Sequence, residues 1–85
     1  MKIAKTDKFV KRYQKLPQNI QKKVDKQILF IQESISHPSL HTKRMQGIDL
    51  WEARVDRSYR LTFERLKDII ILRTVGPHDE GLGKK

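Results

Sequence analysis

Two hydrophobic periods divide the chain, a helical one before residue 38 and an alternating one from residue 50. In the helical part, aliphatic residues recur every three or four positions, which places them on one face of a helix. These residues are Ile20, Val24, Ile28, Ile31 and Ile35. The pattern predicts an amphipathic helix with Pro17 in its first turn. We expect it to end at residues 36–38, because the residue before Pro38 is disfavoured in the α conformation.

A short strand and a first helix are predicted ahead of that helix. Residues 2–5 fit a strand, and Thr6 or Asp7 can cap the helix that follows, because a side-chain oxygen accepts a hydrogen bond from the first turn. The apolar face of this helix is made by Phe9, Tyr13 and Leu16, at spacings of four and three.

The second half of the chain predicts three strands joined by short turns. After a connecting segment, residues 39–49, with Gly47 at a turn, strands are expected from Leu50, from Tyr59 and from Ile69. The last should end at Val75, since Gly76 and Pro77 interrupt it. The apolar face of the first two is formed by Trp51, Ala53, Val55, Tyr59, Leu61 and Phe63. We interpret the three aromatic residues among them as core side chains rather than platforms for stacking bases.

This order of elements predicts an α+β fold in one domain spanning residues 1–85. A strand and two helices precede a three-stranded antiparallel meander, and the helices pack on one face of the sheet. The other face is expected to be more polar and to carry arginines.

Charge and composition narrow the possible functions. The 85 residues include 19 Lys and Arg but only 10 Asp and Glu, a formal charge of +9 that attracts phosphate backbones or an acidic protein. The alternative is that lysine-rich helices are merely solvated. There is no cysteine, no apolar run long enough to span a bilayer and no apolar stretch of a signal peptide near Met1. We therefore expect a soluble cytoplasmic protein.

A charged group on the predicted strands is the best candidate for chemistry. If the alternation holds, Arg54 and Arg60 project from the same side of neighbouring strands, where two guanidinium groups can bind a phosphate. Glu52 shares that side, and His78 follows the end of the last strand. Two arginines, a carboxylate and a histidine suffice for RNA cleavage by attack of a 2′-OH on the adjacent phosphate. The alternatives are a surface ion pair between Arg54 and Glu52 and a loop histidine at position 78.

No motif for a cofactor or a metal accompanies this group. The chain has no glycine-rich phosphate loop and no zinc helix, and His37, His41 and His78 are not spaced as a set of metal ligands. We expect no cofactor and no metal. Candidates for binding the substrate are His41, Lys43, Arg44 and Arg73.

Several segments, in this order, resemble those of RelE/ParE-type toxins. They are residues 9–17 (FVKRYQKLP), 45–47 (MQG), 50–55 (LWEARV), 58–61 (SYRL) and 74–78 (TVGPH), and the resemblance covers nearly the whole chain. The fold that this resemblance implies is the α+β order predicted above.

The resemblance implies roles for particular residues. Arg54 is similar to the catalytic basic residue of RelE, and Arg60 resembles the arginine that contacts the scissile phosphate in RelE and YoeB. His78 lies where YoeB and YafQ have a functional histidine, and His41 is similar to a site histidine of YafQ. Glu52 stands where RelE has lysine, so the general base is open among Glu52, His41 and His78.

The resemblance leaves the activity open between classes. RelE-like members cut mRNA on the ribosome, and a toxin of this type would have mRNA, ribosomal RNA and a cognate acidic antitoxin as partners. ParE-like members inhibit DNA gyrase without cutting RNA. A non-toxic basic module that binds nucleic acid is the third possibility.

Overall fold

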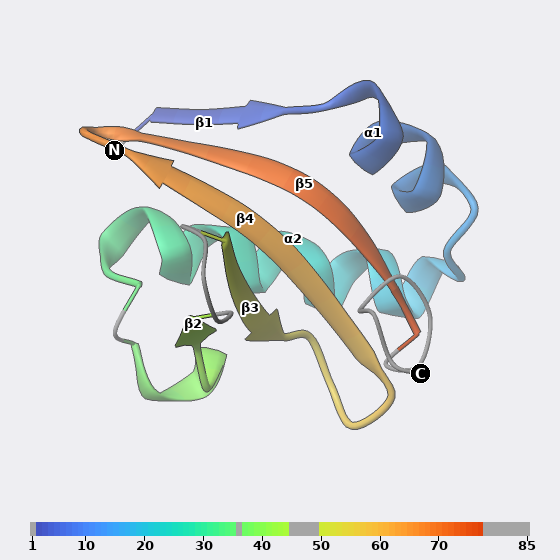
Figure 1. Ribbon diagram of the computed structural model, residues 1–85. Coiled ribbons are helices and arrows are strands. Elements are labelled where there is room, and N and C mark those ends of the chain that lie inside the picture. Colours follow the sequence, from blue (N-terminus) through green and yellow to red (C-terminus); the bar gives the residue numbers. More distant parts are fainter. Residues whose placement is uncertain (1, 36, 45–49, 78–85) are drawn as a thin grey trace.

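A computed structural model describes residues 2–35, 37–44 and 50–77, shown as a ribbon in Figure 1. The strands form one five-stranded sheet in the order β1-β5-β4-β3-β2. They are β1 (Lys2–Lys5), β2 (Lys43–Arg44), β3 (Leu50–Arg54), β4 (Tyr59–Leu66) and β5 (Ile69–Pro77). The helices are α1 (Asp7–Gln14), α2 (Gln18–Glu33) and the 3-10 turn η1 (Pro38–Leu40). The predicted α+β class, with a strand and two helices before an antiparallel meander, is confirmed.

The sheet is mixed because its first strand runs parallel to its last. Lys2 lies opposite Ile69 and Lys5 opposite Leu72, so β1 covers only the first part of β5. Beyond Leu72, the neighbour of β5 on that side is α1, which begins where β1 ends (Figure 1). The short strand β2, which the sequence analysis left within a connecting segment, forms the opposite edge of the sheet.

The start of α1 agrees with the prediction, whereas α2 begins and ends at different residues from those expected. Thr6, and not Asp7, caps α1, because its hydroxyl oxygen accepts a hydrogen bond from the Phe9 N–H at 3.1 Å. Pro17 occupies the N-cap position of α2, without a side-chain capping hydrogen bond, instead of lying within the first turn. The predicted end of α2 at residues 36–38 is wrong, since the backbone turns extended at Ser34, directly after Glu33.

The core lies between the helices and one face of the sheet. Phe9, Val24 and Ile31 from the helices share one buried cluster with Leu61 and Phe63 of β4. The alternation of apolar and polar residues in the sequence therefore predicted the buried face of the sheet correctly. Trp51 stacks on Phe63 across β3 and β4, with ring centroids 6.4 Å apart. In the part of the chain that the structure describes, no helix is both long and apolar enough to cross a membrane.

The strand β5 continues past the position where the sequence analysis ended it. Gly76 lies opposite Arg60 and Pro77 opposite Tyr59, so the expected end at Val75 is wrong. Proline is acceptable as the last residue of a strand, where no further ladder bond is required of its nitrogen. The end of β5 therefore lies level with the start of β4, and this end of the sheet carries the candidate site.

Candidate functional site

Polar side chains line up across four strands on the sheet face away from the core. Arg54 lies directly opposite Arg60, and Glu52 lies directly opposite Thr62. Opposed residues of antiparallel strands point to the same face with Cβ atoms about 4.5–5.5 Å apart, so these side chains form one group. Lys43 on β2 and Thr74 on β5 extend it in register. We call this group the arginine face; its members are Lys43, Glu52, Arg54, Arg60, Thr62 and Thr74.

Arg54 presents an exposed guanidinium on a firmly held backbone. Among the described residues, its side chain makes no hydrogen bond or ion pair. Its carbonyl oxygen accepts a 2.6 Å hydrogen bond from the Nε2 amide of Gln27, which is buried on α2. A fixed backbone beneath an uncommitted cation is the arrangement expected of a residue that binds an anion.

Gln27 also fixes the segment that carries His41. The same Nε2 donates to the carbonyl oxygen of Ser39 at 3.1 Å, so the chain at Ser39 lies beside the end of β3 at Arg54. His41 follows two residues later and is exposed, with the positive φ of 46° that few side chains adopt without a constraint. Gln27 was not predicted as a site residue, although its place within the apolar stripe of α2 was a signal.

Arg60 is anchored to the turn that precedes it. Its Nη1 donates to the carbonyl oxygens of Asp56 at 2.7 Å and Tyr59 at 3.1 Å, and more weakly to that of Arg57 at 3.3 Å. The guanidinium is half-buried and turned toward the turn between β3 and β4. Arg60 thus positions one end of the arginine face, while Arg54 is the more accessible cation.

Asp56 organises this turn through its carboxylate. Its Oδ1 accepts hydrogen bonds from the backbone N–H of Ser58 at 2.8 Å and of Tyr59 at 3.0 Å, and Oδ2 pairs with Lys23 of α2 at 3.3 Å. Desolvation raises the pKa of Asp56, but the hydrogen bonds from Ser58, Lys23 and Tyr59 outweigh it and hold the pKa below its usual range. The turn that binds Arg60 is therefore itself stabilised by an ionised carboxylate.

Thr62, in the middle of the arginine face, is buried without a hydrogen-bond partner. The residue is only 2% exposed, and its Oγ1 finds no partner within the described part of the chain. An unsatisfied buried hydroxyl lowers the free energy of unfolding by about 1–3 kcal/mol. A valine of the same shape would avoid this loss. Stability therefore does not explain a hydroxyl at this position between Glu52 and Thr74.

The remaining candidates are divided between the two faces of the sheet. Lys43 lies opposite Glu52 and so belongs to the arginine face, whereas Arg44 lies opposite Trp51 and shares the other face. Arg73 is set at an irregularity of the β4–β5 pairing, and its Nη1 binds the Oε1 of Glu64 at 3.0 Å. The structure thus groups Glu52, Arg54, Arg60 and Lys43, and separates Arg44 from them.

His78 lies outside the described residues, directly after Pro77 in the sequence. Within the described ranges, no three His, Asp or Glu side chains gather as ligands for a metal ion. Among the described residues, the acid–base groups on or beside the arginine face include the Glu52 carboxylate and the His41 imidazole, whose segment lies beside the end of β3. With Arg54, they provide a proton acceptor and a cation for a negatively charged substrate.

No family model and no curated protein sequence matches the chain. Its fold, in contrast, is similar to several solved toxin structures. A chain of the RelB–RelE antitoxin–toxin complex from Methanococcus jannaschii matches with 27% identity and a TM-score of 0.75, over 89% of this chain and 91% of that one.

Two further structures match at lower identity. YafQ from E. coli strain BL21(DE3) is 15% identical with a TM-score of 0.80, over 95% of this chain and 97% of that one. A YoeB/ParE toxin from Agrobacterium tumefaciens is 14% identical with a TM-score of 0.79, over 92% and 99% of the two chains. These two similarities concern the fold, while the archaeal match adds sequence identity over nearly the full length. In its fold and in this likeness over nearly its full length, the chain is similar to toxins of the RelE/ParE superfamily.

Proposed function

We propose that this chain is the toxin of a type II toxin–antitoxin system and that it cleaves mRNA at the arginine face. The observation that supports the proposal most directly is the pairing of Arg54 with Arg60 across β3 and β4. Like charges in directly opposed positions destabilise a strand pair, whereas a phosphate between or beside them would relieve the repulsion. An anionic substrate is therefore the natural ligand of this face.

The reaction follows from the groups on and beside this face. A base removes the proton of a ribose 2′-OH, and the 2′-oxygen attacks the adjacent phosphorus while the 5′-oxygen of the next nucleotide leaves with a proton. Arg54 offsets the negative charge that develops on the phosphate oxygens. Glu52, His41 and His78 are the candidates for the base and the acid. The products are a 2′,3′-cyclic phosphate and a 5′-hydroxyl.

The unpartnered hydroxyl of Thr62 supports the same assignment. The Thr62 hydroxyl is covered in the resting protein, so it can bond to a phosphate oxygen or a ribose hydroxyl once the side chains of the face move aside for the substrate. Its neighbours in register, Glu52 and Thr74, place it at the centre of the face. We assign Thr62 a role in positioning the substrate rather than in transferring a proton.

The ribosome and an antitoxin complete the proposed partners. The charge of +9 suits binding to ribosomal RNA, and it equally favours an acidic antitoxin segment that neutralises the toxin. Relatives from Methanococcus jannaschii, Pyrococcus horikoshii and E. coli were crystallised as complexes of RelE with RelB, and a RelB-like antitoxin is proposed here on that likeness.

An in vitro translation reaction with mapping of the mRNA ends tests the proposal. We expect cuts in phase with the codons when ribosomes are present, and their loss in Arg54→Ala and His78→Ala. The matched control is Lys5→Ala, an exposed cation on β1 far from Arg54 in the sheet order. Intact mRNA together with inhibited supercoiling by DNA gyrase would contradict the proposal and favour the ParE-like activity.

A further inference from the structure

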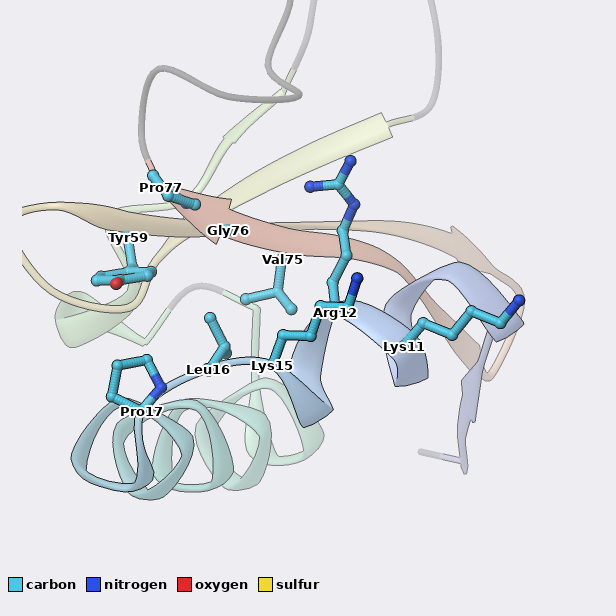
Figure 2. Close-up of a pocket in the computed structure, with 9 residues that line it drawn as sticks. All are labelled: Lys11, Arg12, Lys15, Leu16, Pro17, Tyr59, Val75, Gly76 and Pro77. Carbon is cyan, nitrogen blue, oxygen red and sulfur yellow. The ribbon is translucent and has the colours of Figure 1, made fainter.

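A cavity of about 460 Å³ lies on the helix side of the sheet, at the end where β4 begins and β5 ends (Figure 2). Its size falls in the range of about 300–1,000 Å³ that is typical of small-molecule sites. We call it the α1 groove. The residues that matter here are Arg12, Lys15, Pro17, Tyr59, Gly76 and Pro77.

The α1 groove results from the way the strands and helices end. Because β1 pairs with β5 only as far as Leu72, α1 takes its place along the rest of β5. The start of α1 is fixed to β5, since the Thr6 hydroxyl donates to the Arg73 carbonyl oxygen at 2.8 Å. Its last turn is fixed to α2, since the Tyr13 hydroxyl donates to Oδ1 of Asp25 at 2.7 Å. The walls of the groove are therefore held in place on both sides.

One wall of the groove is cationic and the other is flat and largely apolar. Figure 2 shows Arg12 and Lys15 on the α1 side, and the rings of Tyr59 and Pro17 together on the other, while Lys11 points away from both rings. Tyr59 packs partly against the core, as the alternation predicted, and its remaining surface lines the groove. A nucleotide matches these walls, because its phosphate suits the guanidinium and its base suits the aromatic ring.

Cations are crowded along α1, and Lys11 and Arg12 lie in its last turn, where positive charge suits the helix dipole. Lys8 precedes Arg12 by four residues and Lys11 precedes Lys15 by four, so like charges face each other along a helix of only 8 residues. Pairs of this kind destabilise a helix. Asp7 is the sole acidic residue within α1. Positive charge is therefore concentrated on the helix that forms one wall of the α1 groove.

The α1 groove and the arginine face come close to each other where β4 begins and β5 ends. Gly76, which lines the groove, lies directly opposite Arg60, and Arg60 binds the carbonyl oxygen of Tyr59 at 3.1 Å. We propose that the α1 groove binds one nucleotide of a single-stranded RNA, while the scissile phosphate of the same RNA lies at the arginine face. The phosphate of the nucleotide in the groove contacts Arg12 and Lys15, and its base stacks on Tyr59. This inference rests on the proposed function, because it takes RNA as the ligand of that face.

The test measures binding of short single-stranded RNA with 2′-O-methyl groups, which the 2′-OH reaction cannot cut. Arg12→Gln/Lys15→Gln removes the cationic wall and keeps most of each side-chain stem. Lys8→Gln/Lys22→Gln removes the same charge from exposed helix positions outside the groove. We expect the groove variant to weaken binding about tenfold or more and the control about threefold or less, since only the former loses charge-assisted hydrogen bonds to phosphate.

The salt dependence and the aromatic ring give independent readouts. The slope of log affinity against log salt should fall by about 0.7 in the groove variant, for the one phosphate that both cations hold, and by less than about 0.3 in the control. Tyr59→Phe should bind as the unchanged protein does, because its ring is retained, and Tyr59→Leu should bind more weakly. Equal weakening in the two double variants, with equal salt slopes, would overturn the inference.

Two further outcomes separate this inference from its alternatives. If the groove variant binds RNA normally but no longer binds a poly-glutamate peptide, the groove accepts an acidic protein segment and the inference is wrong. If the unchanged protein cuts no mRNA while the groove and control variants still differ in RNA binding, the proposed function fails and the groove assignment stands. If mRNA is cut and the two variants bind alike, the groove assignment alone fails.

Discussion

Arg54 and Arg60 stand directly opposite each other on β3 and β4, yet only one of them is tied down by the protein. Arg60 donates to the carbonyl oxygens of Asp56 and Tyr59 at 2.7 and 3.1 Å, whereas the described residues offer the Arg54 guanidinium no partner. The turn thereby draws one charge away from the other. The two arginines are therefore expected to differ in what they contribute to stability and to activity.

Replacing each arginine by alanine should separate these contributions. Arg54→Ala should change the free energy of unfolding by no more than about 0.5 kcal/mol, because the side chain is exposed and has no partner to lose. Arg60→Ala should lower it by about 1–2 kcal/mol, because the turn carbonyls lose their donor. Both variants should reduce mRNA cleavage, Arg54→Ala by about 100-fold or more. Urea unfolding gives the first quantity, and equal destabilisation by the two variants would contradict the distinction.

Thr62→Val should make the protein more stable and less active. Valine keeps the shape of threonine and removes the unsatisfied Oγ1, so the free energy of unfolding should rise by about 1 kcal/mol. The control is Thr74→Val, a half-exposed neighbour in register, which should leave stability within about 0.5 kcal/mol. Thermal or urea unfolding and the cleavage assay are read together. A loss of stability in Thr62→Val would contradict this account, because it would show that the hydroxyl stabilises the fold.

Gln27→Leu should destabilise the protein although leucine is apolar and similar in size. The carbonyl oxygens of Arg54 and Ser39 would lose their shared donor, at a cost of about 1–3 kcal/mol. Cleavage should fall as well, since the backbone beneath Arg54 is no longer fixed. Gln14→Leu, at an exposed position of α1, provides the comparison and should be nearly neutral. A neutral Gln27→Leu would mean that the amide does not hold these two segments.

Asp56 predicts a specific acid sensitivity. Its pKa is lower in the folded protein than in the unfolded chain, so its charge stabilises the fold above the unfolded pKa of about 4. This stabilisation is lost as the pH falls through the lowered folded pKa, because the proton then binds in both states. Asp56→Asn should therefore be less stable than the unchanged protein at pH 7, and the difference should shrink below about pH 4. Urea unfolding at several pH values measures it, and a difference that is constant with pH would contradict the assignment.

The sequence predicted those parts of the fold that depend on local periodicity. The alternation from Leu50 placed Arg54 and Arg60 on one face, and the register of β3 and β4 agrees. It did not predict that β1 runs parallel to β5, because that pairing joins residues 67 positions apart, as Lys2 and Ile69 are. Strand β2 was missed because two residues carry no periodic signal.

Part of the candidate site was also beyond the reach of the sequence pattern. The roles of Gln27 and Thr62 depend on which polar atoms burial leaves with or without a partner, and a pattern of apolar positions does not contain that information. Likewise, Lys43 and Arg44 are adjacent cations in the sequence, but only the register of β2 shows that they lie on opposite faces. Side-chain contacts decide such questions, and they depend on the whole fold.

The chemistry of the cut mRNA end tests the central claim most directly. Cleavage at the arginine face by 2′-OH attack predicts fragments with a 2′,3′-cyclic phosphate and a 5′-hydroxyl, and no cut where the ribose carries 2′-O-methyl or 2′-deoxy. The unchanged protein should produce these fragment ends and should leave the 2′-modified positions uncut. Arg54→Ala should produce the same ends far more slowly. Fragments with a 5′-phosphate, or continued cutting at a 2′-deoxy position, would contradict the account.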